Sequence, residues 1–272
     1  MIDLHCHILP GLDDGPAGME QSLDMAKQAV ADGIQTLVAT PHTLNEFYDN
    51  PLQHVEDNVN RLRKTFRKNR ININVCTGSE VRICAGLKQK VIAKEVATLN
   101  NNGRYILVEF PVHVIPPGSK EELFQLKLHN ITPILAHPER NLVFQHQPEL
   151  LSDLTAMGCL VQITAMSITG RFGREAMECA HKLLKNRLSH VIATDAHSPT
   201  NRPPILSPAV QVCARILGSL KEAREMVVNR PQAILNGEPV KAPEPRPLCK
   251  KKWWFNWALP YPLPINHSTI YH

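Results

Sequence analysis

The feature that most constrains the fold of this chain is an alternation of short β-rich runs with helical patterns, from Met1 to about Val228. Repeated βα units of this kind build a parallel sheet, and strands buried on both faces are rich in Val, Ile and Leu. Such runs predict seven strands: Ile2–His7, Thr36–Thr40, Ile73–Gly78, Tyr105–Phe110, Thr132–Ala136, Leu160–Thr164 and His190–Thr194. The length of 272 residues fits one α/β barrel better than two ordinary domains.

Three helices between these strands are well marked. In Pro51–Arg70, apolar residues recur at steps of three and four, which predicts one buried stripe. The stripe comprises Leu52, Val55, Val59, Leu62 and Phe66. Met19–Asp32 and Pro148–Met157 are followed by Gly33 and Gly158, at the position where a left-handed glycine ends a helix.

The domain boundary is predicted near Asn236, because the sequence beyond Pro231 is rich in proline. We expect a barrel over residues 1–236 and a flexible tail over residues 237–272. In the tail, the run Lys250–Trp257 places lysines directly before aromatic residues. Lysine is attracted to anionic lipid and tryptophan to the headgroup region, so this run predicts weak binding to the inner face of the membrane. A protein-docking segment and a loose terminus are the alternatives.

Composition favours an ordinary globular protein of the cytoplasm. Hydrophobic residues make up 43% and charged residues 20%, near globular averages, and no secretion signal or apolar run of spanning length is present. The net charge of +5 comes largely from the tail, which argues against a nucleic-acid partner. The seven cysteines form no C-x-x-C pair, so we expect free thiols.

Histidines and carboxylates stand at the C-terminal ends of most predicted strands, and those ends converge on one site in α/β barrels. They are His5, His7, His42, Glu80, Glu109, His137, Asp195 and His197. A buried cluster of such groups would be costly without cations. Nitrogen and oxygen ligands without thiolate favour Mn²⁺, Fe²⁺ or Zn²⁺. Asp13 and Asp14 could supply one more ligand, and we expect Asp14 to do so rather than to form an Asx turn.

Six motifs carry a resemblance to a known family: His5–Gly15, Ala39–His42, Gly78–Arg82, Val108–Pro111, Ala136–Arg140 and Thr194–His197. In sequence and order they resemble those of the polymerase and histidinol phosphatase (PHP) family. Within it they are most similar to the bacterial manganese-dependent protein tyrosine phosphatases of capsule and exopolysaccharide loci. A departure is Thr43, where relatives often have a second histidine.

The resemblance implies a distorted (β/α)7 barrel that binds three ions, Mn²⁺ or alternatively Fe²⁺ or Zn²⁺. The first ion would be held by His5, His7, Glu80 and Asp195, the second by Glu80, Glu109 and His137, and the third by Asp14, His42 and His197. Arg140 and Arg202 would grip the phosphate, which suits their forked guanidinium groups.

The implied function is hydrolysis of phosphotyrosine on an autophosphorylated bacterial tyrosine kinase that controls capsular or exopolysaccharide synthesis. A hydroxide bridging the ions would attack the phosphoryl group directly. A tyrosine phenolate, with a pKa near 10, leaves more readily than an alkoxide.

Four alternatives remain open. Within the PHP family, the chain could be a histidinol phosphatase, and outside catalysis it could be a silent kinase-binding scaffold. An amidohydrolase or nuclease barrel also begins with His-x-His, but Tyr105–Val112 lacks the bridging lysine of two-metal amidohydrolases. Cys76–Arg82 fits the C-x5-R pattern of cysteine-based phosphatases, but Glu80 would place a carboxylate in the phosphate-binding loop, against its electrostatics.

Overall fold

A curled parallel sheet forms the centre of the molecule. The structure is a computed structural model that describes residues 1–246. Its strands pair in the orders β1-β2-β4 and β3-β5-β6-β7-β8-β9, all in parallel. They are β1 (Ile2–Cys6), β2 (Thr36–Ala39), β3 (His42–Thr43), β4 (Asn74–Thr77), β5 (Glu80–Arg82), β6 (Tyr105–Glu109), β7 (Thr132–Leu135), β8 (Leu160–Thr164) and β9 (Val191–Ala193).

The two sheets are successive parts of one barrel wall. Pro41, which cannot donate a ladder hydrogen bond, separates β2 from β3. Gly78 separates β4 from β5, and a Cβ there would lie 2.8 Å from Val38. The barrel closes between β9 and β1, because the Asp195 amide donates to the His5 carbonyl (2.8 Å) and the His7 amide to the Ala196 carbonyl (2.8 Å). The (β/α)7 prediction is confirmed, with two of the seven strands broken.

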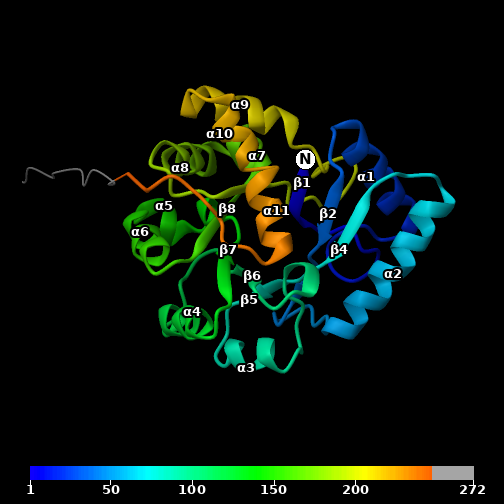
Figure 1. Ribbon diagram of the computed structural model, residues 1–272, viewed down its shortest axis with the longest axis horizontal. Helices are drawn as coiled ribbons and strands as arrows, with labels where there is room; N and C mark the ends of the chain where they lie inside the picture. Colours follow the sequence, from blue (N-terminus) through cyan, green and yellow to red (C-terminus); the bar gives the residue numbers. More distant parts are fainter. Residues whose placement is uncertain (247–272) are drawn as a thin grey trace, which may run out of the picture.

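Helices surround this barrel (Figure 1). They are α1 (Met19–Ala31), α2 (Leu52–Lys68), α3 (Leu87–Ile92), α4 (Ser119–Leu128), α5 (Leu142–His146), α6 (Glu149–Ala156), α7 (Ala165–Ile168), α8 (Arg174–Lys185), α9 (Ser207–Leu217), α10 (Leu220–Glu225) and α11 (Asn229–Asn236), with 3-10 turns η1 (Leu99–Asn101) and η2 (Pro138–Arg140). The five predicted stripe residues of α2 are all buried. Gly33 and Gly158 have φ values of +85° and +94°, as expected for glycines that end α1 and α6.

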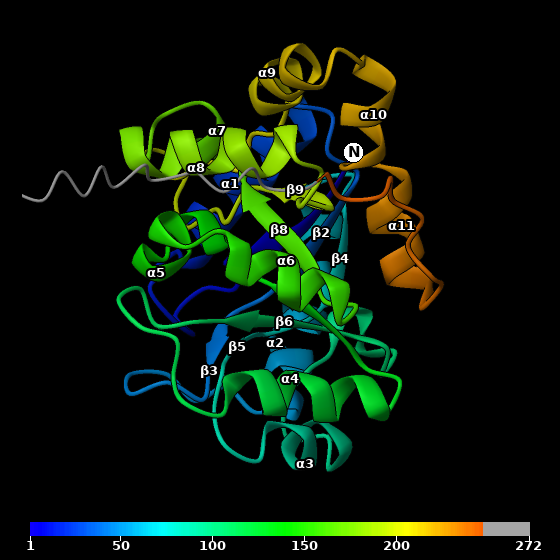
Figure 2. The same ribbon diagram turned by 90° about the vertical axis from the view of Figure 1, so that its left-hand side faces the viewer.

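The end of the barrel at which the strands begin is closed by α11. Ile234 and Leu235 of α11 pack in one cluster with residues from inside the barrel, among them Leu4 and Leu107. Figure 2 shows α11 at this end, whereas β3 and α5 lie toward the other. The open end, which we call the mouth, is therefore the end where the predicted ligands stand.

The described residues contain no helix long and apolar enough to cross a membrane. The cysteines among them are free: Cys6, Cys76, Cys84, Cys159, Cys179 and Cys213. The last described helix ends at Asn236, and the predicted lipid-binding run Lys250–Trp257 lies outside the described residues.

Candidate metal centre

An irregularity in β1 turns two histidines into the barrel. The register gives Asp3–Leu37 and Cys6–Ala39 as successive pairs, so β1 carries one residue more than β2 between them. A bulge of this kind re-aims side chains. Leu4 stays with the inner apolar cluster and Cys6 with the outer one, while His5 and His7 both reach Glu80.

The first group of candidate ligands consists of His5, His7, Glu80 and Asp195, as predicted. His5 Nε2 lies 3.1 Å from His7 Nε2. The two Nε2 atoms lie 3.2 and 3.3 Å from Glu80 Oε2 and 3.3 and 3.4 Å from Asp195 Oδ1. Metal–ligand bonds of about 2.0–2.2 Å place neighbouring ligand atoms about 3–3.5 Å apart. The spacing therefore fits one metal ion at the centre of the group.

Hydrogen bonds on the far side of each ring decide which histidine nitrogens carry protons. The His137 amide donates to Gln162 Oε1 (3.3 Å), which identifies this atom as the oxygen, and His5 Nδ1 therefore donates to it (3.0 Å). His7 Nδ1 donates to Asp13 Oδ2 (2.6 Å). Both Nε2 atoms then face the carboxylate oxygens, where each can carry a proton or, once the proton is displaced, offer a lone pair to a metal ion. Such outer partners typically orient metal-binding histidines.

The charges in this group favour a bound cation. Burial acts to raise the pKa of Glu80, but the charges of His5 and His42, together with hydrogen bonds from His137 and His5, outweigh it and hold that pKa well below the ordinary range. Burial likewise acts to raise the pKa of Asp195, but His5, His7 and the two arginines together outweigh it and hold that pKa well below the ordinary range. Without metal, protons on the imidazoles take the place of the cation. Metal binding must therefore displace protons and weaken as the pH falls.

Glu80 faces a second group through its other oxygen. His137 Nε2 lies 2.8 Å from Glu80 Oε1 and 4.0 Å from Glu109 Oε1. His42 Nδ1 lies 3.0 Å from Glu80 Oε2 and 3.7 Å from Glu109 Oε2. The candidate ligand group here consists of His42, Glu80 and Glu109. The predicted ligand His137 contacts Glu80 from the other side and lies outside this group, so His42 stands where the prediction placed His137. With its two oxygens facing different donors, Glu80 can bridge two ions.

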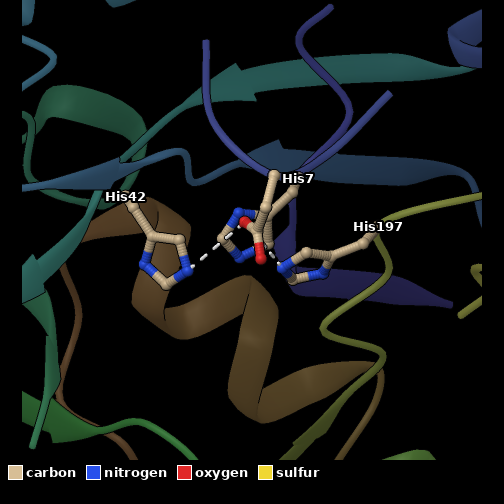
Figure 3. Close-up of side chains that lie close together, drawn as sticks. His7, His42 and His197 are labelled. Carbon is tan, nitrogen blue, oxygen red and sulfur yellow. Dashed lines mark ion pairs between the residues drawn. The ribbon is translucent and has the colours of Figure 1, made fainter. Parts of the chain in front are cut away.

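The third group gathers around the loop after β1. Asp14 Oδ1 lies 3.3 Å from His197 Nε2 and 3.6 Å from His42 Nε2, and His7 belongs to the same group. Figure 3 shows the rings of His7, His42 and His197 pointing toward one another. The Asp14 side chain is 49% exposed, so this group lies nearest to solvent. Its predicted members are together, and His42 has one ring nitrogen toward each of two groups.

The two predicted phosphate-binding arginines stand on the outer side of the first group. Both donate to Asp195 Oδ2, Arg140 through NH1 and Arg202 through NH2. Their guanidinium carbons lie 4.7 and 5.5 Å from the centre of the Phe172 ring. Both side chains keep about a quarter of their surface exposed, so their remaining N–H groups can reach an anion at the mouth.

The C-x5-R motif does not form a phosphate-binding loop. Cys76 is in β4 and packs beside the inner apolar cluster, and burial raises the pKa of its thiol. Arg82 is in β5, where its NH2 lies 3.0 Å from Glu109 Oε2. A thiol that resists ionisation is a poor nucleophile, so this geometry argues against the cysteine mechanism.

Four further residues around the centre have roles that the sequence did not indicate. Gln162 and Phe172 were assigned none, Arg82 was considered only within the C-x5-R motif, and Asp13 only as a possible ligand. Asp13 accepts from His7, from the His42 amide (3.0 Å) and from the Gly15 amide (2.9 Å), so it orients ligands instead of serving as one. Gln162 lies between the apolar residues Val161 and Ile163 of β8, and a polar side chain at such a position indicates a specific partner inside the barrel. Phe172 follows no strand directly, and no sequence pattern indicates its position.

Known proteins show the same architecture over nearly the whole chain. A family model described as capsular polysaccharide synthesis, CpsB/CapC, matches residues 1–236. The putative tyrosine-protein phosphatase CapC of Staphylococcus aureus is 34% identical over 255 residues, 94% of this chain and 99% of that protein. The tyrosine-protein phosphatase YwqE of Bacillus subtilis is 34% identical over 252 residues, 93% of this chain and 98% of that protein.

A solved structure agrees with these sequence matches. It comes from a study of YwqE from Bacillus subtilis and CpsB from Streptococcus pneumoniae, described as unique metal-dependent tyrosine phosphatases. The TM-score is 0.87 and the identity 34%, with 92% of this chain and 100% of that chain covered. The chain described here belongs to the CpsB/CapC family of capsular polysaccharide synthesis.

Proposed function

We propose that this protein is a metal-dependent protein-tyrosine phosphatase. Its substrate would be an autophosphorylated tyrosine kinase that controls capsular or exopolysaccharide synthesis. The observation that carries the proposal is the convergence of two imidazole nitrogens and two carboxylate oxygens within 3.1–3.4 Å. The tyrosine-protein phosphatase names of relatives at 34% identity support the choice of substrate.

We propose three Mn²⁺ ions as the metal complement, one for each group of ligands. The donors are imidazole nitrogens and carboxylate oxygens, a set that suits Mn²⁺, with Fe²⁺ and Zn²⁺ as alternatives. The shared residues Glu80, His7 and His42 place the three groups side by side. Ions bound there would lower the pKa of a water molecule and neutralise charge on the phosphoryl oxygens.

The protein's own residues would orient the substrate and the ligands. Arg140 and Arg202 present forked N–H donors that match phosphate oxygens, and Phe172 supports both guanidinium groups. Asp13 and Gln162 hold the rings of His7 and His5 with their Nε2 atoms inward. This arrangement needs no covalent intermediate, in agreement with the half-buried Cys76 thiol, whose pKa is raised by burial.

The tail would bring the enzyme to its substrate. The run Lys250–Trp257 combines lysines with all three tryptophans of the chain, and weak binding to anionic lipid would raise the local concentration beside a membrane-bound kinase.

Substrate selectivity tests the proposal. The Mn²⁺-supplemented protein would be assayed on a phosphotyrosyl peptide, a phosphoseryl peptide of the same sequence, and histidinol phosphate. We expect kcat/KM to be highest for the phosphotyrosyl peptide. A higher value for histidinol phosphate would assign the protein to the alternative function, and activity on none of the three would favour a silent scaffold.

A further inference from the structure

A pocket opens at the edge of the mouth, directly beside the second ligand group. It is lined by residues 44–47 from the loop after β3, residues 111–113 from the loop after β6, and Arg82 between them, and it has a volume of about 530 Å³. We call it the rim pocket. Its walls include Leu44, Phe47, Pro111 and Val112, so it is largely apolar. A volume of this size is within the range of small-molecule sites.

The rim pocket is connected to the metal centre through Arg82. This side chain contacts Glu109 at 3.0 Å and stands two residues after Glu80 on β5. Alternate residues of a strand face the same side and lie about 7 Å apart. The pocket therefore begins beside Glu80, the carboxylate shared by two of the ligand groups, on the side facing solvent.

Two apolar side chains that line the pocket are strongly exposed to solvent. Phe47 is 82% exposed and Val112 is 46% exposed, on opposite walls. The loop that carries Phe47 is nevertheless ordered by hydrogen bonds, because Asn45 Oδ1 accepts from the Phe47 amide (2.9 Å) and the Tyr48 amide (2.7 Å). The Tyr48 ring in turn lies nearly parallel to the His42 ring, at 6.0 Å and 9°. The two hydrogen bonds to Asn45 order the backbone that carries the exposed Phe47 ring beside the metal centre, so the ring is positioned to contact a ligand.

We propose that the rim pocket receives the aryl ring of the phosphotyrosyl substrate, and that Phe47 and Val112 determine the preference for aryl over alkyl phosphates. This inference rests on the proposed function. With the phosphoryl group at the ligand clusters, the tyrosine ring is the apolar group of the substrate nearest to phosphorus. The residues before and after the phosphotyrosine in the substrate are separated from the phosphorus by the whole tyrosine side chain. They therefore lie too far from the metal centre to enter a pocket that starts at Arg82.

Binding of two phosphonates to the Mn²⁺-loaded protein tests the inference without requiring turnover. Phenylphosphonate and methylphosphonate share the anionic head and differ in the ring. By calorimetry, we expect wild type to bind phenylphosphonate more tightly. An aromatic contact of the usual strength predicts that Phe47→Ala weakens phenylphosphonate binding by about two- to twelvefold and leaves methylphosphonate binding unchanged.

Two further variants complete the test. Val112→Trp fills the pocket from the opposite wall and should exclude phenylphosphonate but not methylphosphonate. Phe124→Ala, which removes a 42% exposed ring from the outer helix α4, should change neither affinity. Equal losses for both phosphonates in Phe47→Ala, or no loss in either pocket variant, would overturn the assignment. If instead phenylphosphonate binds as predicted but no phosphotyrosyl peptide is hydrolysed, the proposed function fails and the pocket assignment stands.

Discussion

Replacing Asp13 by asparagine tests whether outer hydrogen bonds prepare the ligands for metal. Asp13 Oδ2 accepts from His7 Nδ1 and the His42 amide, and Oδ1 accepts from the Gly15 amide. If the asparagine oxygen took the Oδ2 position, the NH₂ group of the side chain would take the Oδ1 position. There it would face the Gly15 N–H, which lies 2.9 Å from Oδ1, and two donors would oppose each other. The flipped side chain would instead lose the bonds from His7 and His42, so neither orientation satisfies all three donors.

The expected result is weaker metal binding with the fold retained. Losing a hydrogen bond of this kind behind a metal-binding histidine typically costs ten- to a hundredfold in affinity, or about 1.4–2.7 kcal/mol. Competition with a chromophoric chelator measures the affinity for Mn²⁺, and a thermal melt in EDTA checks the fold. Asp24→Asn removes the same charge from the exposed surface of α1 and serves as the control. An Mn²⁺ affinity of Asp13→Asn within twofold of the control would refute the role given to this residue.

Three further predictions address bridging, phosphate binding and acid stability. Glu80→Gln should lower aryl phosphate turnover by about a thousandfold, because several kcal/mol of metal-assisted transition-state stabilisation are lost. The control Glu175→Gln, at an exposed position, should keep the wild-type turnover. Comparable turnover in the two variants would exclude bridging by Glu80. Arg140→Lys and Arg202→Lys should keep their metal and raise the inhibition constant of inorganic phosphate about tenfold, and an unchanged constant would remove both from the site. Burial, then Arg230, lowers the pKa of His190 to about 4 from 6.5, so the unfolded chain takes up a proton first as the pH falls. The free energy of unfolding should therefore drop by about 3 kcal/mol between pH 6.5 and 4. With EDTA present, the His190→Gln protein should lose less stability than wild type over this range. If the free energy of unfolding fell equally with pH in both proteins, this role of His190 would be contradicted.

The sequence predicted the strands well because parallel strands buried on both faces have a strong apolar signal. It did not predict β3 and β5, which have only two and three residues and follow the breaks at Pro41 and Gly78. Segments this short carry too few residues for a periodic pattern. The bulge in β1 was also unpredictable, because it depends on pairing with β2 across more than thirty residues of chain.

The ligand positions could be predicted for a related reason. All of them except Asp14 stand at, or within three residues of, the C-terminal end of a predicted strand, and the fold brings those ends together. Assigning a role to each residue was harder. Adjacent aspartates Asp13 and Asp14 are equivalent in the sequence, and only the turn around Gly15, where a Cβ would lie 2.6 Å from the His7 carbonyl, points one toward His7 and the other toward His197. Phe172 and Phe47 lie in loops with no regular pattern, so their places beside the centre depend on tertiary structure alone.

The central claim is that phosphotyrosine is hydrolysed by metal held at the barrel mouth. Its most direct test is the initial rate on a phosphotyrosyl peptide as Mn²⁺ is returned to chelator-treated protein, with bound metal counted in the same samples. We expect a rate near zero without metal that rises with bound Mn²⁺, equally in wild type and Cys76→Ser. A metal-free protein that keeps its full rate, or a Cys76→Ser protein that metal cannot activate, would contradict it.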